Sequence, residues 1–171
     1  RMKDLITGLY EDWLWLDERV DQIASEIAEI GKQDRDCTRL MTVPGIGPVI
    51  ATAIVAAIGQ GEAFDRGRDF AAWLGLVPRQ YSTGGRTTLG GISKRGNRHL
   101  RMLFVQAARV ILLRAKNWEK FSFGPWLQEA GGRLHHNKLA VALANKLARI
   151  AWSVLSNKKD FDGHKDAAMA I

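Results

Sequence analysis

A pair of hydroxyl residues beside two glycines is the part of this sequence best suited to chemistry on a phosphate group. Ser82 and Thr83 directly precede Gly84 and Gly85. A side-chain hydroxyl can attack a phosphodiester, and arginine side chains can neutralise the charge that builds on the phosphorus oxygens in the transition state. The basic residues around this segment are Arg79, Arg86, Lys94, Arg95, Arg98 and Arg101.

The same segment has a second interpretation, as a loop that grips phosphate without a covalent role. Hydroxyl, amide and arginine groups are ordinary ligands of the nucleic-acid backbone, and Ser93 and Asn97 add two more polar side chains. No obvious general base is nearby, because His99 is more typical of a surface or interhelical position. The residues alone therefore favour phosphate binding over nucleophilic catalysis.

A glycine-containing turn at residues 43–48 provides a second candidate phosphate site. Gly45, Ile46 and Gly47 lie between two prolines and separate two short helical segments, the pattern of a helix-hairpin-helix. Backbone amides at such a turn and at the start of the next helix have no intrahelical partner, so they can hold a phosphate near the positive helix end. The alternative is a tight structural turn in which Pro48 begins the second helix.

Metal-binding residues are sparse. Cys37 is the single cysteine, and the adjacent His135 and His136 point in different directions, with no carboxylate at ligand spacing. The acids are scattered, so none of them forms a site for the two magnesium ions used in DNA cleavage. We therefore expect no metal or cofactor in this chain, and a reducing compartment suits its single thiol.

The charge distribution is strongly asymmetric. Residues 1–36 contain five Lys/Arg and ten Asp/Glu, whereas the remaining residues contain twenty and eight. Residues 66–116 contain eleven basic residues and a single acidic residue, Asp69. A concentrated positive field of this kind favours a polyanion as partner, and nucleic acid is the commonest polyanion.

A heptad pattern predicts one long helix at the beginning of the chain. Its apolar residues recur in alternating steps of four and three, which is typical of a coiled coil. The seam consists of Met2, Ile6, Leu9, Trp13, Leu16, Val20, Ile23, Ile27 and Ile30. We assign residues 1–36 to this helix, which can pair with its own copy or with an antiparallel helix.

The rest of the chain predicts a compact helical domain over residues 37–157. Apolar periodicity indicates helices near residues 49–58, 65–76, 97–115 and 137–155, while the glycine-rich residues 79–97 are loop-like or weakly β. Residues 117–132 read as an aromatic-rich connection and residues 158–171 as a flexible tail. The expected fold is mainly α, a long coiled-coil helix followed by a helical domain with the helix-hairpin-helix and the Gly-rich loop.

Five motifs, in this order, resemble the C-terminal domain of insertion-sequence 110/1111 family transposases, also called bridge recombinases, to which the Piv DNA invertases are related. They cover residues 40–47, 70–79, 81–85, 92–97 and 100–101. The preceding coiled coil and the closing helix also fit, so the resemblance covers nearly the whole chain. It identifies a domain that handles DNA in transposition.

The resemblance implies more than the residues alone. Family members carry an N-terminal RuvC-like domain whose four acids bind Mg²⁺, recombine DNA directed by an RNA encoded by the element, and assemble as dimers and tetramers. A serine in the glycine-flanked loop is thought to form a phosphoserine link with DNA. It falls here at Ser82, with Thr83 as the alternative, because Thr83 directly precedes the glycine.

These inferences define the expected protein. We expect the C-terminal part of a bacterial transposase that lacks its metal domain and is inactive alone, and that is cytoplasmic and nucleoid-associated. No apolar run is long enough for a membrane span, since each is interrupted well before that length. The alternative is a non-catalytic nucleic-acid-binding module. We also expect the Gly45–Gly47 turn and the hydroxyl loop to form one continuous surface that grips a nucleic-acid strand.

Overall fold

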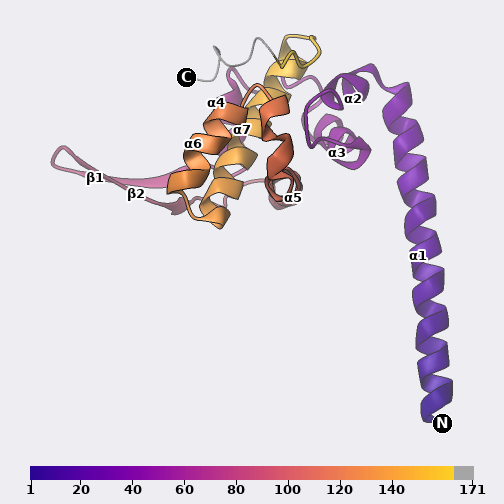
Figure 1. Ribbon diagram of the computed structural model, residues 1–171. Helices are drawn as coiled ribbons and strands as arrows, with labels where there is room; N and C mark the ends of the chain where they lie inside the picture. Colours follow the sequence, from indigo (N-terminus) through magenta and orange to yellow (C-terminus); the bar gives the residue numbers. More distant parts are fainter. Residues whose placement is uncertain (164–171) are drawn as a thin grey trace.

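The computed structural model describes residues 1–163 and shows a mainly α-helical protein, which confirms the predicted fold class (Figure 1). A single two-stranded antiparallel sheet interrupts the helices in this part of the chain. The elements are α1 (Met2–Gln33), α2 (Arg35–Leu40), α3 (Pro48–Ile58), α4 (Gly67–Trp73), β1 (Pro78–Thr83), β2 (Arg86–Ile92), α5 (Arg98–Leu113), the 3-10 helix η1 (Ala115–Lys120), α6 (Gly124–Arg133) and α7 (His136–Ser156).

Helix α1 is the long helix that the heptad pattern predicts. Its 32 residues correspond to a length of about 48 Å, and Figure 1 shows it as a rod that stands away from the other helices. Only its C-terminal end touches the body, where Gly31 is buried near Pro48 and Thr52 of α3. The apolar seam upstream is exposed: Leu9 retains 69% of its accessible surface and Trp13 57%.

Helix α7 is the centre of the core. It contacts α2, α4, α5 and α6, and its buried side chains include Leu143, Leu147 and Leu155. By length and composition α7 could cross a membrane, which the sequence analysis did not anticipate. The burial of its apolar face by four neighbouring helices accounts for this hydrophobic composition.

Residues 117–132 form helical structure rather than the connection expected from the sequence. η1 and α6 fill this region, and the side chains of Trp118, Phe121 and Trp126 pack against the core. Gly124 is required here, because a Cβ at this position would overlap the Trp118 carbonyl oxygen. Glycine and proline suggested a loop in the sequence, yet Pro125 lies in the first turn of α6, where proline is well tolerated.

Helix α2 is stabilised locally by its own polar residues. The Asp34 carboxylate accepts a hydrogen bond from the Cys37 amide at 2.8 Å and caps the helix. Burial, reinforced by the neighbouring Asp34, raises the pKa of the Cys37 thiol to about 11. The thiol is therefore protonated at neutral pH and acts as a small apolar side chain of the core.

The segment after α7 packs against the α2 end of the body. The Phe161 amide donates a hydrogen bond to Thr42 Oγ1 at 2.8 Å, and the Phe161 ring packs on the core. Phe161 lies within residues 158–171, the predicted flexible tail. The remainder of that predicted tail, residues 164–171, lies outside the described residues.

Candidate nucleic-acid interface

The hydroxyl pair lies near the tip of a projecting β-hairpin. Strands β1 and β2 pair antiparallel and are joined by Gly84 and Gly85, whose φ angles are 55° and 80°. Positive φ at both central residues is the requirement of the two-residue type I′ turn, which glycine meets without strain. Only the foot of the hairpin lies near the helices, where Ile92 lines a surface together with α5 residues. Figure 1 shows the rest of the hairpin extending from the body, away from α1.

The two hydroxyl side chains lie on different faces of this hairpin. Ser82 pairs with Thr87, and Thr83 pairs with Arg86. Because cross-strand partners share a face and successive residues alternate, Arg86 lies on the Thr83 face and not on the Ser82 face. On the Ser82 face, Gln80 Nε2 donates a hydrogen bond to Ser82 Oγ at 2.9 Å. That bond leaves the serine proton available for removal by a base.

The hairpin itself contains no general base. Residues 78–92 include neither a carboxylate nor a histidine, and Arg79 and Arg86 are their only charged residues. Both hydroxyl residues are exposed. Any reaction at these oxygens therefore needs a proton acceptor from another segment or another molecule.

Two glycines at the base of the hairpin fix its attachment to the body. Gly75 ends α4 and Gly96 precedes α5, with φ angles of 71° and 75°. A Cβ at Gly96 would overlap the Trp73 carbonyl oxygen, and a Cβ at Gly75 would overlap the Arg95 carbonyl oxygen. The end of α4 and residues 93–96 are thus in direct backbone contact, which positions Lys94, whose φ angle is itself 57°.

The side chains of four predicted contact residues make intramolecular hydrogen bonds at this base. Arg101 Nη1 donates to the carbonyl oxygens of Leu74 at 2.7 Å and Arg95 at 3.0 Å. Asn97 Oδ1 accepts from the Leu100 amide at 2.9 Å and caps α5. The two weaker bonds run from Arg79 Nη2 to the Ser93 carbonyl oxygen and from the Arg95 amide to Ser93 Oγ, each 3.4 Å long. These side chains therefore hold the segment in shape.

A basic groove begins at the foot of the hairpin and follows α5. Its volume is about 360 Å³, and its lining contains four cations and no carboxylate. The lining residues are Ile92, Lys94, Arg98, Arg101, Met102, Val105, Gln106, Arg109 and Val141. Lys94, Arg98 and Arg101 were predicted as contacts, whereas the α5 residues from Met102 to Arg109 and Val141 of α7 were missed. Spacing of three and four residues after Arg98 was the available signal for the α5 members.

The glycine turn between α2 and α3 lies on the other side of α5. A Cβ at Gly45 would lie 2.9 Å from Ile111 Cδ1 and 3.5 Å from the Ala107 carbonyl oxygen. Successive residues of an α-helix are rotated by about 100° around the helix axis. The side of α5 that carries Ala107 and Ile111 therefore points about 180° away from the side that carries Arg98 and Arg109. The expected single surface that combines the turn with the hydroxyl loop is therefore wrong.

Within the turn, the three predicted residues differ in availability. The Ile46 side chain is buried, and its amide already donates to the Val43 carbonyl oxygen at 3.0 Å. Gly45 is exposed and Gly47 half-buried. Among the described residues, the amides of these two glycines have no hydrogen-bond acceptor. The turn can offer these two donors to a ligand, separately from the groove.

Metal ligands do not gather in the described part of the chain. No group of three or more histidine, cysteine, aspartate or glutamate side chains is placed to hold an ion there.

Residues 37–122 match the transposase family described as IS116/IS110/IS902. The chain is 45% identical over 150 residues to the transposase for insertion sequence element IS1328 of Yersinia enterocolitica, covering 88% of this chain and 45% of that protein. It is 39% identical over 162 residues to the transposase for insertion sequence element IS1111A of Coxiella burnetii, covering 94% and 44%.

The pilin gene-inverting protein of Moraxella bovis is also similar, at 28% identity over 149 residues, covering 86% of this chain and 44% of that protein. The chain spans less than half the length of each of these relatives. The family match, together with identities of 39% and more over most of the chain, establishes the relationship. The chain belongs to the IS116/IS110/IS902 transposase family.

Proposed function

We propose that this chain binds DNA during transposition, along the α5 groove and the adjoining hairpin. The observation that carries the proposal is the groove lining, in which Lys94, Arg98, Arg101 and Arg109 stand without any carboxylate. Lysine and arginine side chains in such an arrangement neutralise successive phosphates and release counterions, which is the main source of sequence-independent affinity for DNA. We infer cytoplasmic action on the bacterial nucleoid, since DNA is the target.

The apolar part of the groove suits the sugar edge of a nucleic-acid backbone. Met102, Val105 and Val141 line it between the cations. Contacts of this kind position a strand and carry no base information. The groove is therefore a positioning surface, and choice of the target sequence is assigned to another component, which the family resemblance suggests is an RNA encoded by the element.

We further propose that Ser82 is the nucleophile of the recombination reaction. Its Oγ attacks the phosphorus of a DNA phosphodiester, and a new P–O bond forms as the bond to the leaving sugar oxygen breaks. The serine proton passes to a general base outside the hairpin, and the leaving oxygen takes up a proton. Support comes from the exposed primary hydroxyl and from Gln80, which holds its oxygen while leaving its proton free.

The base and the metal chemistry are assigned to other parts of the complete transposase. Because this chain spans less than half of its relatives, we propose that a second domain supplies a general base and holds Mg²⁺. A second candidate function is a binding module without covalent chemistry. The absence of a carboxylate or histidine from residues 78–92 favours that alternative for the isolated chain.

Neutralising the groove should weaken binding to DNA in a salt-dependent manner. We expect Arg98→Gln and Arg109→Gln each to reduce the slope of log K against log salt on duplex DNA by about 0.9, because each removes one phosphate contact. Fluorescence anisotropy of a labelled duplex over a salt series measures the slope. Lys120→Gln, at an exposed residue of η1 outside the groove, is the matched control. Equal slopes in wild type and both groove variants would contradict the proposal.

The exposed seam of α1 should mediate self-association. We expect the chain to form a dimer or tetramer in solution, and Leu9→Lys combined with Leu16→Lys to produce a monomer, because both charges lie on the coiled-coil face. Multi-angle light scattering measures the mass. Thr7→Lys with Ser25→Lys, both off the seam, should keep the oligomer. A monomeric wild-type chain would contradict the proposed self-association.

A further inference from the structure

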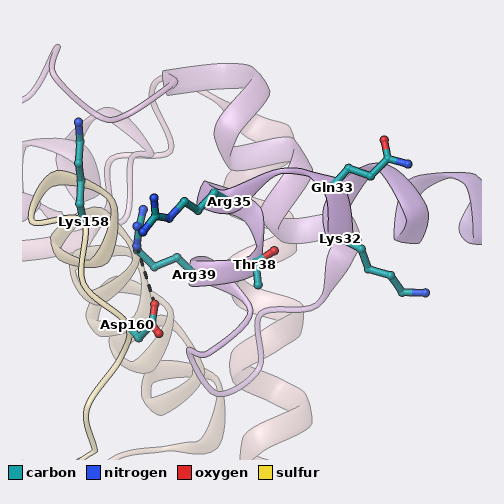
Figure 2. A pocket seen from close by; sticks show the side chains of 7 residues that line it. All are labelled: Lys32, Gln33, Arg35, Thr38, Arg39, Lys158 and Asp160. Atoms are coloured by element: carbon teal, nitrogen blue, oxygen red, sulfur yellow. Dashed lines mark ion pairs between the residues drawn. The ribbon is translucent and has the colours of Figure 1, made fainter.

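A second basic pocket lies at the junction of α1, α2 and the segment after α7, away from the groove. It has a volume of about 540 Å³. Figure 2 shows the head groups of Arg35 and Arg39 close together, with Arg39 beside Asp160. The Lys158 side chain lies at the edge of the pocket and points away from Asp160, while Lys32 and Gln33 extend in another direction. Its lining residues are Lys32, Gln33, Arg35, Thr38, Arg39, Lys158 and Asp160.

Arg39 is the buried element of this pocket. Only 8% of its side-chain surface is exposed, and Nη1 forms an ion pair with Asp36 of the same helix. Its Nε is buried and has no hydrogen-bond acceptor among the described residues. The carboxylate of Asp160 is 3.8 Å from Nε, too far for a hydrogen bond, and its side chain is 75% exposed. A buried donor without an acceptor is costly, so Arg39 is suited to an incoming oxygen anion.

Two further cations flank Arg39 without acidic partners in the described structure. Arg35 and Lys158 are both exposed and form no ion pair there. Lys158 has a φ of 53°, a conformation in which glycine is the favoured residue at a helix C-terminus. Lys32 contributes less, because Glu29 lies 2.6 Å from its ammonium group. Arg35, Arg39 and Lys158 thus line one pocket, with Asp36 and Asp160 as the nearby opposing charges.

We infer that this pocket binds a phosphate group of a nucleic-acid backbone, as a second contact site independent of the groove. Arg39 Nε, Arg35 and Lys158 supply the donors, and Asp160 gives way to the phosphate at the exposed edge. The neighbouring turn extends the site, since Thr42 is bonded to Phe161 beside the pocket and is followed by the free amides of Gly45 and Gly47. Adjacent donor sets suit a chain of phosphates better than one small ion.

Salt-dependent binding of two nucleic acids tests this inference. Labelled duplex DNA and a labelled RNA stem-loop are titrated with the wild type, Arg35→Gln, Lys158→Gly and the control Lys120→Gln. We expect each pocket variant to lower the salt slope by about 0.9 on a duplex and the affinity about eightfold near 0.1 M salt. Lys158→Gly also relieves the positive-φ strain, so its thermal stability should not fall and a loss of binding cannot be attributed to unfolding.

The two nucleic acids and the groove variants separate the possible results. If the pocket variants lower the salt slope and the affinity only for DNA, DNA is the source of the phosphate. If they lower them only for RNA, RNA is the source. Either result supports the pocket. Wild-type slopes on both, with binding lost in Arg98→Gln, overturn the pocket and leave the proposed function intact. If Arg98→Gln keeps the wild-type slope and the pocket variants lose binding, the groove is overturned and the pocket is supported. Inorganic phosphate at constant ionic strength should raise the wild-type melting temperature more than chloride; if only this effect is seen, the site holds an adventitious ion only and the inference fails.

Discussion

Replacing Gly96 with alanine should destabilise the folded domain by about 3 kcal/mol or more. The new methyl group would overlap the Trp73 carbonyl oxygen, and the φ of 75° is unfavourable for any residue with a Cβ. Neither problem is relieved by a side-chain rotation, because both involve backbone atoms, and each is a recognised source of destabilisation of order 1–3 kcal/mol. The loss is a large part of the stability of an ordinary domain, about 5–15 kcal/mol.

Urea denaturation followed by circular dichroism measures this effect. Gly91→Ala is the matched control, because Gly91 lies in the same region with nothing within 4 Å of its added Cβ; its stability should change by no more than about 0.5 kcal/mol. A Gly96→Ala variant as stable as the Gly91→Ala variant would show that α4 and the hairpin base do not require this backbone contact. Binding by Lys94 should weaken together with stability, since Gly96 holds that segment in place.

Replacing Ser82 with alanine should abolish covalent attachment to DNA in the complete transposase while leaving its affinity for DNA unchanged. The substitution removes the proposed attacking oxygen, and the side chain is exposed, so no core contact is lost. A nicked suicide duplex, followed by denaturing electrophoresis, detects a protein–DNA adduct that resists denaturant. Binding is measured separately by anisotropy, because loss of both signals would indicate loss of the bound complex rather than of the nucleophile.

Thr83→Ala is the control for the assignment of the hydroxyl. We expect this variant to retain the adduct, because Thr83 lies on the other face of the hairpin. If the adduct is lost with Thr83→Ala and retained with Ser82→Ala, the nucleophile is Thr83, which has Arg86 directly opposite on its own face. Adduct formation in both single variants would eliminate both hydroxyls as the nucleophile and favour the non-catalytic binding module.

Local patterns predicted the helices well because each carries its own periodicity. The heptad seam defines α1, and the buried residues Leu100, Phe104 and Ile111 follow one face of α5. The glycine-rich residues 79–97 were less informative, since the Gly84–Gly85 pair allows either a loop or the hairpin turn observed. The exposure and alternating faces of Ser82 and Thr83 depend on strand register, which the sequence did not define.

The candidate site was predictable only in part, because it is assembled from distant segments. Val141 of α7 lines the groove beside Arg98 of α5, and no local pattern links them. Arg101 was read as a phosphate contact from its charge, whereas its bond to the Leu74 carbonyl oxygen depends on the tertiary fold. The turn at Gly45 was expected beside the hydroxyl loop, but Ile111 holds it on the opposite side of α5. The sequence thus indicated the chemical types of the side chains at the site, but it did not indicate their positions relative to one another.

The lack of packing around the β-hairpin has a consequence for when the proposed reaction can occur. A two-stranded ribbon without a covering layer is only marginally stable in water, so the free chain does little to fix the direction in which Ser82 points. Attack on phosphorus requires the Ser82 oxygen to be closely aligned with the phosphodiester. On the proposed mechanism, this alignment comes from surfaces that pack against the hairpin in the assembled complex. On this mechanism, the unassembled chain does not hold the Ser82 hydroxyl in line with a phosphodiester, so that strand breakage requires the assembled complex.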